Sequence, residues 1–281
     1  MTVRGKRLKP GDASDESVNE EPGRAPALAL SDVSRKFRLS RSKSVVALEH
    51  LDLSIAQGEF VALVGPSGCG KSTVLRMIAG LDNPTTGEVQ VSGEPPEALA
   101  KSHQLGVAFQ DHALLPWLSV RGNVALPYRV AGRKVDHERV RELVELVGLG
   151  KFIDARPAQL SGGMRQRTSI ARALLLQPKV LLLDEPFGAL DAVTRRRLNL
   201  ALQRIWLLER TTTVLTTHSV EEALFLADRV VVMSAGPGRI IDEFISPFPR
   251  PRVNEIRHEP DFQAMTAKIE GQLDHANADN L

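Results

Sequence analysis

Cysteine is almost absent from the 281 residues: with Cys69 as the one example, no disulfide can form within the chain, and a reducing compartment is favoured. A surplus of one charge is lacking too. The chain has 36 Lys and Arg against 34 Asp and Glu, whereas nucleic-acid-binding proteins usually carry a basic excess. Apolar residues at 42% and charged residues at 25% are typical of a compact globular protein. We therefore expect a cytoplasmic protein without a nucleic-acid partner.

Long hydrophobic runs are also missing. The longest, such as residues 60–64, hold about five residues, whereas a membrane-spanning helix needs roughly 20. The first basic residues are followed by Gly, Asp and Glu and not by the apolar region of a signal peptide, so we expect neither a membrane span nor export by that route. Residues 1–26 have almost no large apolar side chains, which predicts a flexible N-terminal tail.

Apolar stretches typical of strands alternate with helical patterns from residue 27 onward. Continuous apolar runs suit strands that are covered on both faces, and the strand candidates are residues 28–33, 45–55, 60–64, 180–183, 212–216 and 230–233. Residues 191–210 have helical spacing, with one apolar face formed by Leu198, Leu202, Ile205 and Leu208. The alternation predicts an α/β fold with a largely parallel sheet.

The middle and the end of the chain differ from this pattern. Residues 111–167 lack long β-branched runs and have a helical pattern at 135–147, which indicates a helical subdomain inserted into a core of residues 27–110 and 168–245. Prolines at 247–251 interrupt regular structure. Residues 246–281 are therefore expected to form a C-terminal tail with one helix near 261–273.

A glycine-rich loop lies between the strand candidate 60–64 and a helical pattern, and it fits the motif G-x-x-x-x-G-K-[ST]. Its residues are Gly65, Pro66, Ser67, Gly68, Cys69, Gly70, Lys71, Ser72 and Thr73. In this context backbone N–H groups converge on phosphate oxygens, Lys71 reaches the β and γ phosphates, and Ser72 holds Mg²⁺. We interpret Cys69 as a small residue that fits the loop and not as a nucleophile, because no histidine is beside it in sequence.

Two carboxylates follow the apolar run 180–183. Alternation along a strand points Asp184 and Glu185 in opposite directions, so that one can face Mg²⁺ and the other the attacking water. Phosphoryl transfer needs such a group to orient or deprotonate water. His218 follows another strand candidate, and a parallel sheet would bring it to the same edge, where it could contact the γ phosphate. The histidines have no metal-ligand spacing, and we predict no structural zinc.

A second glycine-rich helix start lies at residues 160–167, where Ser161 is a candidate N-cap and Gly162 and Gly163 open a helix with a further anion site. This stretch resembles the signature sequence of ATP-binding-cassette (ABC) ATPases. The resemblance implies a P-loop NTPase core of the ABC-ATPase type. It also implies a head-to-tail dimer, in which the signature of one copy closes over the nucleotide in the P-loop of a second copy.

Other family elements follow in order as far as about residue 245. Gln110 looks like the Q-loop glutamine, and His218 matches the switch histidine. The resemblance implies ATP and Mg²⁺ as cofactors, with metal contacts from Ser72, Gln110 and Asp184 and catalytic roles for Lys71, Gln110, Glu185 and His218. Phe37 stands where the family stacks an aromatic ring on adenine, and a core aromatic is the alternative.

The resemblance further implies partners in a membrane. In the family, the segment after the Q-loop glutamine docks on a cytoplasmic helix of a transmembrane permease; here that segment is 111–118, with Trp117 and three leucines. Trp117 as a core residue of the helical subdomain is the alternative. We expect a complex with permease subunits and a solute-binding protein that does not touch this chain. The chain itself is expected to be peripheral, on the cytoplasmic side of the inner membrane.

Two stretches, 115–120 and 225–240, look like ATPase subunits of bacterial importers for nitrate, aliphatic sulfonates and taurine. They predict an ATP hydrolase that energises transport of a small anion. Importers of thiamine precursors or aromatic acids, and an exporter, stay open as alternatives. A soluble ABC ATPase is disfavoured because only 51 positions separate Gln110 from Ser161, too few for a long coiled-coil insertion. A scaffold that binds ATP without hydrolysis is disfavoured by the presence of both Lys71 and Glu185.

Overall fold

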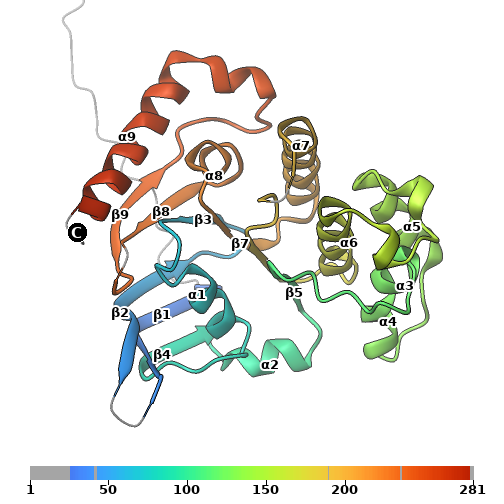
Figure 1. The fold of residues 1–281 in the computed structure, drawn as a ribbon, viewed down its shortest axis with the longest axis horizontal. Helices are drawn as coiled ribbons and strands as arrows, with labels where there is room; N and C mark the ends of the chain where they lie inside the picture. The colour runs from blue at the N-terminus through green and yellow to red at the C-terminus, as the bar shows by residue number, and fades with distance from the viewer. Residues whose placement is uncertain (1–25, 41–42, 189, 235, 279–281) are drawn as a thin grey trace, which may run out of the picture.

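The computed structural model describes residues 26–40, 43–188, 190–234 and 236–278 (Figure 1). The expected N-terminal tail, residues 1–26, lies outside the described residues apart from Pro26. Within the described ranges, no helix combines the length and the apolar character that crossing a membrane requires.

The central layer is a six-stranded sheet in the order β5-β6-β7-β3-β8-β9. All pairs are parallel except β8 with β9, as the sequence predicts for most of the sheet. Every residue of β3, β6 and β7 is buried, which explains the continuous apolar runs of β3 and of residues 180–183 in β6. In β7 the buried residues are four threonines beside Val214 and Leu215. The strands are β3 (Phe60–Val64), β5 (Leu105–Ala108), β6 (Val180–Asp184), β7 (Thr212–Thr217), β8 (Arg229–Met233) and β9 (Ile240–Ile245).

A three-stranded antiparallel sheet, in the order β2-β1-β4, covers one face of the central sheet. Its strands are β1 (Leu28–Arg38), β2 (Ser44–Ile55) and β4 (Thr86–Val91). Strand alternation divides the core: Val61 and Leu63 of β3 pack with this sheet and with α1 (Lys71–Ile78), while Phe60 and Ala62 face the opposite side. The short helix α2 (Pro96–Lys101) follows β4.

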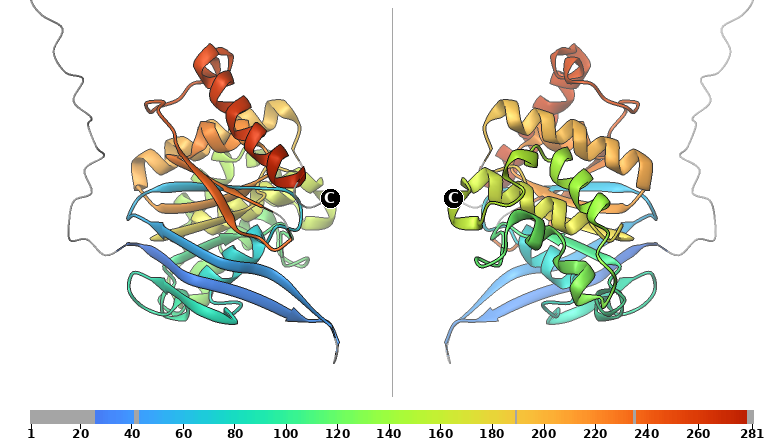
Figure 2. Two further views of the ribbon diagram at one scale, coloured as in Figure 1. Left: turned by 90° about the vertical axis from the view of Figure 1, so that its left-hand side faces the viewer. Right: turned by 90° about the vertical axis from the view of Figure 1, so that its right-hand side faces the viewer.

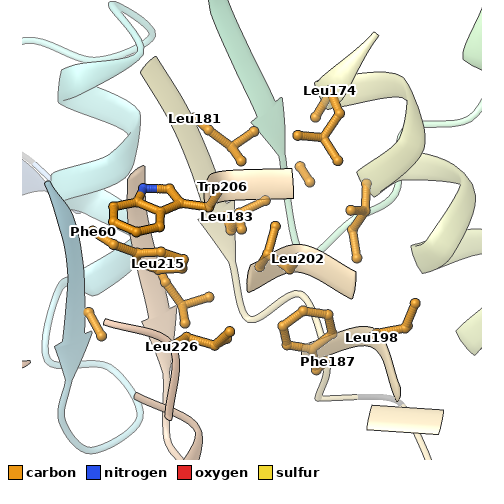
Figure 3. Packing of buried hydrophobic residues seen from close by; sticks show 14 of the residues in the cluster. Phe60, Leu174, Leu181, Leu183, Phe187, Leu198, Leu202, Trp206, Leu215 and Leu226 are labelled. Atoms are coloured by element: carbon orange, nitrogen blue, oxygen red, sulfur yellow. The ribbon is translucent and has the colours of Figure 1, made fainter. Parts of the chain in front are cut away.

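The opposite face is covered by α7 (Ala192–Glu209) and α8 (Val220–Leu226) (Figures 1 and 2). Leu198 and Leu202 are buried as their spacing predicts, but Leu208 is 78% exposed, so its place on the apolar face is wrong. Trp206 is buried instead, with its ring centroid 6.0 Å from that of Phe60 (Figure 3). Leu198, Leu202 and Trp206 are spaced four residues apart and form the buried face of α7, and Leu208 lies outside that face.

The helical region lies at one side of the molecule, where α3, α4 and α5 group together (Figure 1). Its elements are α3 (Val120–Val124), α4 (Leu126–Val130), α5 (His137–Leu146) and the 3₁₀ turns Gly150–Phe152 and Pro157–Gln159. Helix α6 (Gly162–Leu174) contacts both α3 and β5, so the second glycine-rich motif opens the helix that joins this region to the sheet.

The C-terminal segment packs against the core through its helix. A 3₁₀ turn (Asn254–His258) leads into α9 (Pro260–Ala278), which contacts α8, β8 and β9. The helix expected near 261–273 is present and extends beyond both ends of that range. Phe262 and Ile269 are fully buried in the core, and Figure 2 shows α9 on the side opposite the antiparallel sheet. These apolar residues on one face of α9 hold the helix against the core, although prolines interrupt regular structure in the stretch before it.

Candidate functional site

The loop between β3 and α1 has the close approaches that require glycine. Gly70 has a φ of 94°, and a Cβ on it would lie 2.5 Å from Leu48 Cδ2. A Cβ on Gly65 would lie 2.7 Å from Cys69 Sγ, and Cys69 is fully buried. The thiol thus occupies space that the glycine leaves free, in agreement with its interpretation as a small packing residue. Gly68 has a φ of 82° and open space in front of it, so the backbone is accessible there.

The ammonium group of Lys71 lies against this loop. Its Nζ donates hydrogen bonds to the carbonyl oxygens of Gly65 at 2.8 Å and Pro66 at 3.0 Å. The side chain is 5% exposed, so its charge is held in a largely desolvated position beside the first turn of α1. The charge of Lys71 and the positive end of the α1 dipole therefore both favour an anion at the start of α1.

Three oxygen-bearing side chains meet at the carboxyl edge of the sheet. Ser72 Oγ donates to Asp184 Oδ1 at 2.9 Å, and Thr216 Oγ1 donates to the same oxygen at 2.7 Å. Asp184 and Thr216 are register partners in the parallel pair β6–β7, and Ser72 reaches them from α1. The sequence predicts Ser72 and Asp184 at one place. It gives no signal for Thr216, because that depends on which strand lies beside β6.

Glu185 and His218 lie next to this cluster. Strand β6 ends at Asp184, and Glu185 has a φ of 45°, so the turn and not strand alternation sets its direction. Two hydrogen bonds of 3.1 Å from its backbone N–H, to O and Oγ1 of Thr216, hold this unusual conformation. Its Oε2 lies 3.8 Å from His218 Nδ1, longer than a hydrogen bond, and the His218 side chain is 58% exposed.

A cleft of about 450 Å³ brings most of the expected residues together. It is lined by Phe37, Ala47, Ser67, Gly68, Gly70, Lys71, Ser72, Thr73, Gln110 and Glu185. Phe37 is 36% exposed at this cleft, with the Arg35 guanidinium 4.6 Å from its ring centroid, so it is not a core aromatic. Ala47, which sequence reasoning misses, lies on β2 and reaches the cleft only because β2 packs over the loop.

The second glycine-rich motif is outside the lining of this cleft. Ser161 caps α6, its Oγ accepting the Met164 N–H at 3.3 Å, as its position predicts. Ser161 is exposed, and a Cβ on Gly162 would meet only an Arg165 guanidinium nitrogen at 3.9 Å. This helix start therefore presents its backbone outward and not to the cleft of its own chain.

The segment 111–118 also faces outward. Trp117 is 65% exposed, so its assignment to the core is excluded. Buried Asn123 organises the backbone, accepting the Leu115 N–H at 2.8 Å and donating to the carbonyls of Leu115, Leu118 and Ser119, each at 3.1 Å. Arg172 of α6 donates to the carbonyls of His112 and Ala113, and burial lowers its pKa. An exposed aromatic thus stands on a fixed loop.

A family model described as ABC transporter matches residues 48–188, which include the loop, Gln110, the motif at 161–163, and Glu185. The chain belongs to the ABC transporter family. This ABC cassette is 42% identical over 248 residues to the aliphatic sulfonates import ATP-binding protein SsuB of Bacillus cereus, a match that covers 88% of this chain and 96% of that one. It is 48% identical over 215 residues to the nitrate import ATP-binding protein NrtD of Synechococcus elongatus, covering 75% and 78%.

A longer relative is the bicarbonate transport ATP-binding protein CmpC of Synechococcus elongatus, 44% identical over 248 residues. The match covers 86% of the cassette but 37% of that relative, so the chain spans little more than a third of its length. Among solved structures, the dimeric bacterial ABC transporter cassette MJ0796 matches with a TM-score of 0.73 and 31% identity, covering 79% of this chain and 100% of that one. A structure of MJ0796 in a post-hydrolysis state with ADP and Pi matches to the same extent.

Proposed function

We propose that this ABC cassette binds and hydrolyses ATP to drive import of a small anion through a separate permease. Its relatives are named for import or transport of aliphatic sulfonates, nitrate and bicarbonate, all small anions. The observation that carries the proposal is the cleft, in which the phosphate loop, Gln110 and Glu185 converge while the second glycine-rich motif is left outside. The cassette would act peripherally, on the cytoplasmic side of the cell membrane.

For ATP binding, residues 65–73 supply the phosphate cradle. The open backbone at Gly68 and the helix N-terminus at Gly70 offer N–H groups to phosphate oxygens, and Lys71 supplies charge to the β and γ phosphates. Phe37 lines the same cleft and offers its ring to adenine. Lys71 would exchange its bonds with the loop carbonyls for bonds to phosphate, an exchange of neutral acceptors for charged ones.

The oxygen cluster at the sheet edge fits Mg²⁺, because a hydroxyl and a carboxylate are the hard donors that this ion prefers, and they lie 2.9 Å apart. Ser72 and Asp184 would hold the ion, with Gln110 of the same cleft as a further ligand. Bound there, Mg²⁺ would neutralise charge on the β and γ phosphates. Thr216 positions the Asp184 carboxylate through its 2.7 Å hydrogen bond.

For hydrolysis, Glu185 orients the attacking water and takes its proton. Its carboxylate lines the cleft, and the strained turn after β6 directs it away from Asp184. His218, close to Glu185 Oε2, contacts the γ phosphate. Lys71 stabilises the charge that the phosphoryl group carries during transfer. Together, Lys71, Gln110, Glu185 and His218 form the catalytic set.

The site is completed by a second copy. Ser161, Gly162 and Gly163 at the exposed N-terminus of α6 would contact the γ phosphate held in the cleft of the partner, head to tail. ATP then joins two cassettes, and hydrolysis removes the bridge. The dimeric form of the similar cassette MJ0796 supports this arrangement.

Coupling to the permease would run through residues 111–118. Exposed Trp117 and the fixed loop around it present an apolar surface to a permease helix, and Gln110 joins that loop to the cleft. The solute-binding protein belongs to the same complex but does not contact this chain.

A reconstituted system tests the proposal. The chain and the permease with which it copurifies are placed in proteoliposomes, and phosphate release and uptake of labelled nitrate, taurine and bicarbonate are measured. We expect ATP-dependent uptake of one small anion and faster hydrolysis in its presence with the binding protein. Full-rate hydrolysis by an isolated monomer, or copurification with no membrane protein, would contradict the proposal.

A further inference from the structure

His218 lies between two residues that belong to a closed ring of hydrogen bonds. The Ser219 N–H donates to Thr217 Oγ1 at 3.1 Å, and Thr217 Oγ1 donates to Glu222 Oε2 at 2.6 Å. The Glu222 N–H donates to Ser219 Oγ at 3.2 Å and closes the ring. The backbone is therefore held on both sides of His218, while the imidazole projects out of the ring and is 58% exposed.

The ring is a capping box with a hydroxyl inserted. Ser219 is the N-cap of α8 and Glu222 is its third helical residue, where a glutamate normally reaches back to the N–H of the N-cap. Here that N–H goes to Thr217 Oγ1, and Glu222 accepts from Thr217 instead. The usual box caps a helix. This one also ties the helix to the last residue of β7.

The carboxyl group of Glu222 is buried, and its desolvation costs free energy. Glu222 is 4% exposed among the fully buried residues Ala223, Leu224 and Phe225, and burial raises the pKa of its carboxyl group. Its Oε1 has no hydrogen-bond partner within the described residues. Burying a carboxyl group with one oxygen unpaired costs free energy. The hydrogen bond that its other oxygen accepts from Thr217 must offset part of that cost.

The far end of α8 is fixed independently. Arg252 Nη1 donates to the carbonyls of Leu224 at 2.8 Å, Phe225 at 3.1 Å and Ala227 at 2.7 Å, and Arg250 donates to that of Leu226. The carbonyls of the last helical turn thus have partners from the C-terminal segment. With that end held, the chain beside His218 is fixed by the ring and by the β3–β7 ladder, in which Thr217 is the register partner of Val64.

We propose that Glu222 is a positioning residue for His218, acting through the hydroxyl of Thr217 to hold the imidazole beside Glu185. This inference rests on the proposed function, since it gives Glu222 a role in ATP hydrolysis by way of His218. Glu222 touches neither nucleotide nor water in this role. It decides where the histidine stands and not whether ATP binds.

The test measures kcat and KM for ATP hydrolysis by the reconstituted complex, and Tm of each chain. We expect Glu222→Ala and Thr217→Val each to lower kcat about tenfold with KM within about twofold, as for loss of one positioning hydrogen bond. Glu222→Gln and Thr217→Ser retain the acceptor and the hydroxyl, so we expect them to keep kcat within about twofold. Asp261→Ala, which removes an exposed carboxylate from the first turn of α9, is the control and should leave kcat unchanged.

Two double variants separate positioning from general support of the fold. Combined with His218→Ala, Glu222→Ala should reduce kcat no further, and Thr217→Val with Glu222→Ala should be no worse than either single change. If Glu222→Ala does not fold, the Thr217→Val and Thr217→Ser pair decides alone. Additive loss in the His218→Ala background, or wild-type kcat in folded Thr217→Val, would overturn the inference. Failure of the wild-type complex to hydrolyse ATP, or full activity of His218→Ala, would instead overturn the proposed function.

Discussion

Two glycine-rich helix starts, those of α1 and α6, look alike in sequence and differ in their surroundings. At α1 the loop is enclosed: Gly70 approaches Leu48, Lys71 is buried, and Glu185 faces the same cleft. At α6 the start is exposed, with Ser161 as the cap, and a Cβ on Gly162 would have only an Arg165 guanidinium nitrogen near it, at 3.9 Å. Both can bind anions through backbone N–H groups, but chemistry is assembled around α1.

In the proposed function, each chain supplies two unequal halves of a site. The α1 half has the buried charge of Lys71 and the carboxylate proposed to be catalytic, whereas the α6 half has a helix dipole and accessible backbone. A phosphate held by α1 alone would leave α6 without a ligand. The proposed head-to-tail pairing would remove this asymmetry, because each α6 would then face the α1 cleft of its partner.

The largest effect is expected at the enclosed half. Glu185→Gln removes the carboxylate that we propose takes the proton from water, but it keeps the size of the side chain. ATP hydrolysis should fall by about 10²- to 10⁴-fold while ATP affinity is retained. Steady-state phosphate release and equilibrium nucleotide binding measure the two quantities, and sedimentation should show that ATP now holds the chain as a dimer. Unchanged turnover would remove Glu185 from the reaction.

The exposed half is tested by Gly162→Asp, which places a negative charge at the N-terminus of α6. Repulsion of the γ phosphate across the dimer should lower hydrolysis by about 10²-fold, while ATP binding by the monomer stays the same. Gly271→Asp in α9, where space is also open, is the control and should have no effect on hydrolysis. A loss of monomer affinity in Gly162→Asp would place α6 at its own cleft and contradict the half-site model.

The two starts should also differ in their tolerance of a methyl group. Gly70→Ala adds a Cβ 2.5 Å from Leu48 in a backbone with φ 94°, and should lower the free energy of unfolding by about 2 kcal/mol. Gly162→Ala adds it where only an Arg165 guanidinium nitrogen is near, at an ordinary contact distance of 3.9 Å, and we expect a change within about 0.5 kcal/mol. Urea unfolding followed by circular dichroism measures both. Equal losses would show that the enclosure at α1 has no energetic consequence.

A third helix start, that of α8, differs from both because it has a buried carboxyl group of its own, that of Glu222. Burial raises the pKa of Glu222, so between its usual and its raised pKa the folded chain binds a proton that the unfolded chain has released. Stability from this group is therefore lost as pH rises through that window.

Glu222→Gln removes this dependence and is the smallest effect. The variant should have a higher Tm than the wild type at pH 7, and the difference should shrink as pH falls toward the ordinary glutamate range. Thermal unfolding at a series of pH values measures it. A difference that grows in acid would reverse the sign and show that the carboxylate stabilises the fold by being charged.

Much of the fold follows from local pattern. The buried strands β3, β6 and β8 have apolar runs typical of a sheet covered on both faces, and the helix at 192–209 follows from its spacing. The strands β4 and β9 were not predicted. Both are short and partly exposed, and their pattern is weak because the neighbouring strand and not burial holds them.

The same division applies to the site. The phosphate loop and the pair Asp184 and Glu185 are each a short run of consecutive residues, so the chemistry of each can be recognised from residue type and spacing alone. Thr216 and Ala47 come from strands whose neighbours are set by the sheet order, which no local pattern contains. The exposure of Trp117 likewise depends on how Asn123 fixes its loop.

The phosphate loop, the paired carboxylates and the second glycine-rich helix start can all be identified from residue type and short spacing, because glycine, lysine and carboxylate chemistry depends on these alone. Three other features appear only in the folded chain: one helix start is enclosed and the other exposed, the C-terminal segment holds α8, and Glu222 closes a ring around His218. These depend on contacts between residues distant in the chain, whose energies come from packing and from buried hydrogen bonds that form only once the layers have assembled.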